Sequence, residues 1–109
     1  MKTLLSALLL LTSTAVFAEC DRPAAPELPD GEVSDLQTMV DGQKAVKAYV
    51  AATEAYLACL TAEEEQAGGE ADPEVAMERI EEHNAAVDEM EAIANQFNEE
   101  IREYKAKGQ

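Results

Sequence analysis

Residues 34–60 read SDLQTMVDGQKAVKAYVAATEAYLACL, and this stretch decides the fold. Its apolar residues recur at heptad spacing, which is typical of a helix that packs against another helix. Ser34 and Gln37 have the spacing of a capping box, and the glycine pair at 68–69 is a stop signal. We therefore expect a helix over residues 34–67. Its two heptad stripes are Leu36, Gln43, Val50 and Leu57, and Met39, Val46, Thr53 and Leu60.

A second helix is predicted over residues 73–107, after a loop at 68–72. Asp72 is typical of an N-cap, and Pro73 suits a first helical turn. A loop this short forces two long helices into an antiparallel hairpin, so the predicted fold class is all-α. The expected seam of this helix consists of Ala76, Ile80, His83, Val87, Met90, Ala94, Phe97, Ile101 and Tyr104.

The loop length also predicts which residues face each other. We expect Met39 opposite Phe97, and His83 opposite Thr53. His83 is the only imidazole of the chain, so it is either a pH-sensing residue or metal ligand, or a structural residue hydrogen-bonded to Thr53 or Glu54. Because zinc needs more nitrogen or sulfur ligands than the chain offers, we expect no metal site.

Residues 1–18 have the pattern of a secretory signal peptide. Lys2 supplies the positive charge, residues 4–11 are the apolar core, and Val16 and Ala18 suit signal peptidase. The apolar run is too short for a transmembrane helix. We therefore expect cleavage after Ala18 and an exported product, periplasmic or extracellular, that is not inserted in a membrane.

Charge and composition exclude several functions. The 109 residues include 23 acids and 8 bases, for a net charge of -15, and loss of residues 1–18 removes one further base, Lys2. Such a charge repels nucleic acid and anionic lipid. The sequence also lacks a nucleophile elbow and a phosphate-binding loop. We expect neither an enzyme nor a cofactor.

Residues 19–33 are predicted to form an extended arm. Pro23, Pro26 and Pro29 recur at every third residue. Because polyproline II has three residues per turn, these prolines share one edge of the arm.

The arm is long enough to fold back along the first helix. From Cys20 to Val33 it spans about 40 Å in polyproline II, and the helix covers about 39 Å from Val33 to Cys59. Two cysteines in an exported chain predict a disulfide, here Cys20–Cys59. The prolines would then dock against Tyr49 and Tyr56, which share a flank of the helix.

Three motifs occur together within residues 20–60: Cys20-x-x-Pro23-x-x-Pro26-x-x-Pro29-Asp30-Gly31, Val46-Lys47-x-Tyr49, and Tyr56-Leu57-Ala58-Cys59-Leu60. In these motifs the chain resembles a group of small exported bacterial proteins with a proline-rich head and a helical body. The resemblance implies a shared fold and compartment, and it implies no chemistry, since the group has no assigned function.

One candidate interaction surface is the outward face of the first helix, which is nearly uncharged. Small side chains allow close approach of another helix, from a protein partner or from a second copy in a homodimer. The alternative is that alanine is simply the best helix former. The alanines of this face are Ala48, Ala51, Ala55, Ala58 and Ala62.

Acidic residues gather at the hairpin tip, where they would either bind calcium weakly or form a solvated loop. We expect a non-enzymatic exported protein that acts through protein–protein contacts. The alternatives are an acidic binder of cations or ligands, and an envelope chaperone for acid stress. The tip acids are Glu63, Glu64, Glu65, Glu70, Asp72 and Glu74.

Overall fold

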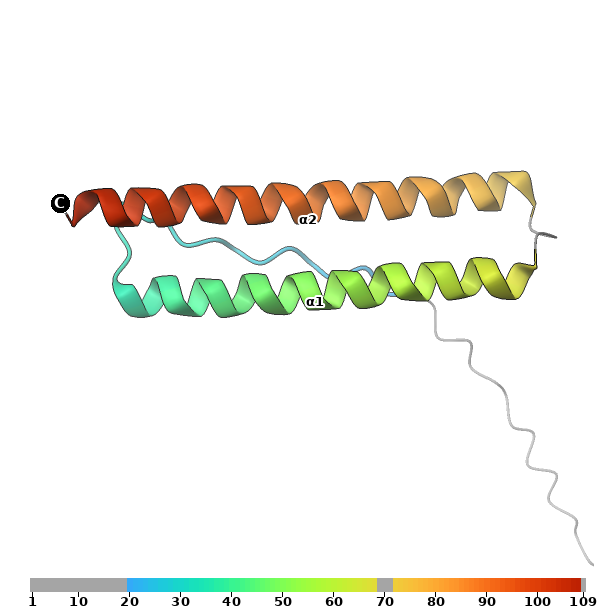
Figure 1. The fold of residues 1–109 in the computed structure, drawn as a ribbon, viewed down its shortest axis with the longest axis horizontal. Coiled ribbons are helices and arrows are strands. Elements are labelled where there is room, and N and C mark those ends of the chain that lie inside the picture. The colour runs from blue at the N-terminus through green and yellow to red at the C-terminus, as the bar shows by residue number, and fades with distance from the viewer. Residues whose placement is uncertain (1–19, 69–71, 109) are drawn as a thin grey trace, which may run out of the picture.

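The computed structural model describes residues 20–68 and 72–108, so the predicted signal peptide lies outside the described residues. The described chain is all-helical, with helix α1 at Leu36–Ala67 and helix α2 at Pro73–Lys107, and it contains no strand. The two helices pack against each other along their length (Figure 1). The predicted all-α hairpin is therefore confirmed.

The start of α1 follows from its capping residue. The Asp35 carboxylate accepts a hydrogen bond of 2.8 Å from the Thr38 N–H. The N-cap is thus Asp35 rather than Ser34, because the Ser34 backbone still belongs to the preceding turn and its N–H donates to the Asp30 carbonyl. Hydrogen bonding from the Thr38 side chain and backbone lowers the pKa of Asp35.

The end of α1 and the start of α2, on either side of the loop, are each set by local residues. Gly68 ends α1 with a φ of 59°, a left-handed conformation that glycine adopts without steric cost. Asp72 caps α2 by accepting a hydrogen bond of 2.9 Å from the Glu74 N–H, and Pro73 fills the first helical position. Among the described residues, neither helix is long and apolar enough to cross a membrane.

The core consists of two clusters along the hairpin. Met39 and Phe97 both belong to the cluster nearer the start of α1. The described part of the arm, residues 20–33, supplies a side chain to each cluster: Leu28 packs against the first and Cys20 against the second. The buried members are Met39, Val46 and Phe97 in the first cluster, and Tyr56, Leu60 and Ala86 in the second.

The two predicted heptad stripes of α1 have different environments. The stripe from Met39 to Leu60 is buried throughout. The other stripe is not: Leu36 is 63% exposed, Gln43 is exposed, and Val50 and Leu57 are only half-buried. The arm is the reason, because it draws the neighbouring flank of α1 into the core. That flank contributes Gly42, Tyr49 and Tyr56 to the buried residues.

Candidate functional site

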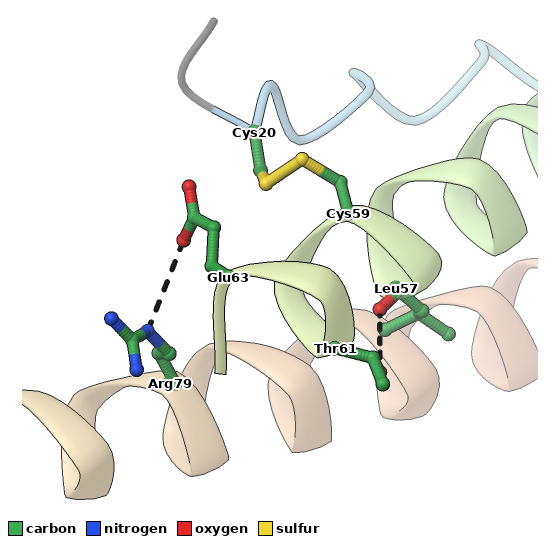
Figure 2. The surroundings of a disulfide bond; sticks show 6 residues. All are labelled: Cys20, Leu57, Cys59, Thr61, Glu63 and Arg79. Atoms are coloured by element: carbon green, nitrogen blue, oxygen red, sulfur yellow. Dashed lines mark hydrogen bonds and ion pairs between the residues drawn. A yellow bond between two sulfur atoms is a disulfide. The ribbon is translucent and has the colours of Figure 1, made fainter. Parts of the chain in front are cut away.

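A disulfide attaches the arm to α1. Cys20 and Cys59 are bonded with their Cα atoms 5.7 Å apart, which confirms the predicted disulfide. Figure 2 shows the bond beside Glu63 of α1, whose carboxylate lies 3.9 Å from the Arg79 guanidinium of α2. Because both sulfurs are used in this bond, neither is available as a nucleophile or as a metal ligand.

The arm runs along the groove between the helices, and in Figure 1 it passes behind both of them. Pro23, Pro26 and Pro29 are all half-buried. The Pro29 ring covers Gly42, where a Cβ atom would come within 2.7 Å of the proline Cγ. Close approach of the arm therefore explains a glycine in the interior of α1.

Arg22 links the arm directly to α2 and, through Glu89, to α1. Its guanidinium donates to the Glu89 carboxylate at 2.8 Å and to the Ala85 carbonyl at 3.2 Å. The other carboxylate oxygen of Glu89 accepts a hydrogen bond of 3.0 Å from the Tyr49 hydroxyl. Arm, α1 and α2 thus meet at one carboxylate.

The two tyrosines predicted to receive the arm are both buried, Tyr49 at 5% and Tyr56 at 6% exposure. Burial raises the pKa of the Tyr49 phenol, and the hydrogen bond to Glu89 raises it further. Burial also raises the pKa of Tyr56. Both groups are held in the neutral state, which suits structural residues.

A tight turn anchors the other end of the arm to α2. The Glu32 N–H donates to the Asp30 carboxylate at 2.9 Å, and the Gly31 N–H donates to the Glu100 carboxylate at 2.7 Å. A Cβ atom at Gly31 would lie 1.9 Å from the Glu100 carbonyl oxygen and 2.9 Å from the Tyr104 nitrogen. Only glycine fits this contact between two backbones.

This turn brings three carboxylates together. Oxygens of Asp30, Glu100 and Glu103 lie within 4.8 Å of one another. Repulsion from Glu100 is the largest cause that raises the pKa of Glu103. Calcium takes six to eight oxygen ligands, so three partly exposed carboxylates are an incomplete set.

His83 is not where the sequence predicted. It is half-buried and lines a hollow with Leu60 and Thr61, while the buried hydroxyl of Thr53 has no hydrogen-bond partner. The predicted contact between His83 and Thr53 is therefore wrong. Because α1 stays helical up to Ala67, residues at equal distances from the loop face each other, and His83 lies level with the last turns of α1.

The two surfaces proposed from the sequence adjoin each other on α1, where Ala62 directly precedes Glu63. The five alanines at positions 48, 51, 55, 58 and 62 are all exposed. At the tip, Glu63 faces Arg79, while Glu64, Glu65, Asp72 and Glu74 are exposed. Glu70 lies outside the described residues.

The side of the hairpin away from the arm has two shallow hollows, of about 330 Å³ and about 210 Å³. Each is lined by both helices, and by none of the described arm residues. Leu36, Gln43 and Ile101 line the larger hollow, near the start of α1. Glu64 and Ile80 line the smaller one, near the tip.

Two heptad stripes connect these hollows. Leu36 and Gln43 at one end and Glu64 at the other share a heptad position on α1, so the residues between them lie on the same side. Ile80 and Ile101 are likewise three heptads apart on α2. We call this surface the open face; it consists of Leu36, Gln43, Val50, Leu57 and Glu64 of α1, and Ile80, Val87, Ala94 and Ile101 of α2.

Sequence reasoning missed three features of these surfaces. Arg22 is the only base in the arm, and this could have suggested an ion pair. The glycines at 31 and 42 could have suggested close backbone approach. The exposure of Leu36 has no signal in the sequence, because its heptad position resembles that of a core residue.

No protein-family model, no curated protein and no solved structure matches this chain. The candidate surfaces therefore depend on the geometry of this structure.

Proposed function

We propose that this protein is a non-enzymatic exported protein, periplasmic or extracellular, that acts through protein–protein contacts. Export is supported by the signal-peptide pattern of residues 1–18 and by the Cys20–Cys59 disulfide, since disulfides persist in oxidising compartments. A non-enzymatic role is supported by the placement of reactive groups. Ser34 and His83 lie near opposite ends of the hairpin, and both cysteines are oxidised.

The proposal of protein contacts is supported mainly by the open face. Large apolar side chains are exposed there, Leu36 by 63% and Ile80 by 51%, and Met77 one turn before Ile80 is 56% exposed. Exposed apolar patches on a small protein mark interaction surfaces. The alanine face is the competing surface, but its side chains are too small to anchor a partner strongly.

Export is tested by expressing the full chain in a bacterial host and measuring the intact mass of the product in each cell fraction without reduction. We expect a periplasmic or secreted product that begins at Glu19 and contains the disulfide. A cytoplasmic chain that keeps residues 1–18 would contradict the export proposal.

Protein contacts are tested by placing a photo-crosslinking amino acid at Gln43 on the open face, with Ala55 on the alanine face and Ala24 of the arm as matched positions. All three side chains are exposed. We expect a discrete adduct in intact cells from Gln43 only. An adduct from Ala55 alone would move the contact to the alanine face, and no adduct from any position would contradict the proposed function.

A further inference from the structure

We propose that the open face binds a second copy of this chain, face to face and with the two hairpin tips at opposite ends, so that four helices form one bundle. This inference rests on the proposed function and names the partner. It uses the open face, and it leaves the alanine face on the outside of the dimer.

The α2 stripe of the open face is complementary to itself. A two-fold axis that crosses α2 between residues 90 and 91 sets Ile80 opposite the Ile101 of the second copy, and Val87 opposite its Ala94. Each pairing occurs twice by symmetry. The larger side chains meet at the ends, and the smaller ones meet near the axis.

The charges beside the α1 stripe are also complementary under this symmetry. If the axis crosses α1 between residues 50 and 51, Lys47 lies level with the Glu54 of the second copy. On their own helix these two residues are about 10 Å apart along the axis, too far to pair with each other. Both side chains are exposed, and neither has an ion-pair partner within residues 20–68 and 72–108.

One axis lies at the centre of the stripes of both helices, and it sets the exposed Glu91 of α2 opposite the Glu91 of the second copy. Two contacts near the ends of the hairpin relate positions on the two helices: Lys107 donates to the Ser34 carbonyl at one end, and Arg79 lies near Glu63 at the other. Counting inward from either contact places residues 50–51 of α1 level with residues 90–92 of α2. Two positions chosen from separate sequence patterns therefore coincide in space.

The distribution of charge along the hairpin favours opposite tips. The described tip carries an exposed row of acids, while Lys105 and Lys107 lie at the far end. Two hairpins stacked with their tips together would bring these acids against each other. With the tips apart, the Glu64 end of each open face meets the end that contains Lys105 in the second copy.

The area of the open face is sufficient. The open face is about 42 Å long from residue 36 to residue 64 of α1, and about 19 Å wide, because the helix spacing of about 9 Å adds to one helix diameter of about 10 Å; its footprint is therefore about 800 Å². A stable interface buries about 800 Å² on each partner. A dimer would also cover Leu36 and Ile80, the two most exposed apolar members of the open face.

The test is sedimentation equilibrium of the oxidised, exported chain across a wide range of protein concentration. We expect a monomer–dimer equilibrium. Lys47→Glu should weaken the dimer by at least about tenfold, because two attractive contacts become repulsive. Glu54→Lys should weaken it similarly, although it lowers the net negative charge. The double variant K47E/E54K should return the dissociation constant to within about threefold of wild type.

Lys44→Glu is the matched control, since Lys44 is exposed on α1 and lies off the open face. It should change the dissociation constant by less than about threefold. The dimer proposal is overturned by a monomer at all concentrations, by an equal effect of Lys44→Glu, by a dimer strengthened by Glu54→Lys, or by a double variant that stays weak. If the chain is monomeric and Gln43 still crosslinks to another protein, the proposed function stands and only the second copy is excluded.

Discussion

The two long faces of this hairpin have the same heptad pattern and opposite surroundings. On one side the arm lies along the groove (Figure 1), and Tyr49 and Tyr56 are buried. On the other side Leu36 and Ile80 remain more than half exposed. The difference shows that a two-helix hairpin buries only one of its two grooves when one short segment is available to cover it.

The covering segment needs fixed ends to be effective. Cys20 is bonded to Cys59, Arg22 donates a hydrogen bond to Glu89, and the Gly31 backbone contacts the backbone of α2. The open face has none of these attachments from the described arm. Changes to the covered face are therefore expected to alter stability more than changes to the open face.

The largest effect is expected from removing the disulfide. The double variant C20S/C59S releases the arm and should lower the free energy of unfolding by about 4 kcal/mol, because the bond closes a loop of about 40 residues. Thermal unfolding followed by circular dichroism measures the change. A variant that melts like wild type would show that the arm does not hold the covered face.

Gly31→Ala tests the other end of the arm. The new methyl group would collide with the backbone of α2, so we expect a loss of about 3 kcal/mol in denaturant unfolding. Gly108→Ala is the matched control, since the nearest atom to a Cβ there is 3.6 Å away. Equal losses for the two variants would mean that the contact at Gly31 is not close.

Met39→Ala and Leu36→Ala compare the two faces directly on neighbouring turns of α1. Met39 is 6% exposed and its truncation should cost about 2–3 kcal/mol. Leu36 is 63% exposed, so its truncation should cost less than about 0.5 kcal/mol in the monomer. Urea unfolding at low protein concentration measures both, and a larger cost for Leu36 would reverse the assignment of the faces.

Thr53→Val tests the cost of burying the Thr53 hydroxyl between the two core clusters. The Thr53 hydroxyl is buried and has no hydrogen-bond partner, so its replacement by a methyl group should stabilise the protein by about 1 kcal/mol. Thr61→Val should give no such gain, because the exposed Thr61 hydroxyl donates to the Leu57 carbonyl. Destabilisation by Thr53→Val would indicate a bound water at this hydroxyl.

The smallest effect is expected from Glu103→Gln, which tests the carboxylates at the turn of the arm. Because the folded-state pKa of Glu103 is raised, its contribution to stability is lost as the pH rises through that pKa. The variant should therefore melt slightly higher than wild type near pH 7 and equally near about pH 3. Glu81→Gln is the matched control for removing one carboxylate from the exposed α2 surface.

The sequence alone was enough to predict the local structure. Heptad spacing gave the two helices, Asp72-Pro73 gave the start of α2, and a short loop required an antiparallel pair. The paired cysteines and the threefold proline repeat predicted an arm attached to α1 at Cys59, and the disulfide is present. These features depend on residues close in sequence or on chain length, so they can be predicted from the sequence alone.

Only the tertiary structure decided which stripe of α1 is buried, which residue His83 faces, and where the backbones of the arm and α2 touch. A heptad pattern marks two neighbouring stripes as apolar, but it does not say which groove the arm fills. Which residues of the two helices face each other depends on where α1 ends. At its other end, α1 follows the N-cap Asp35, because Ser34 remains in the turn of the arm. The reason is that the arm, α1 and α2 all pack side chains into one small core, and these contacts join residues that are far apart in the sequence.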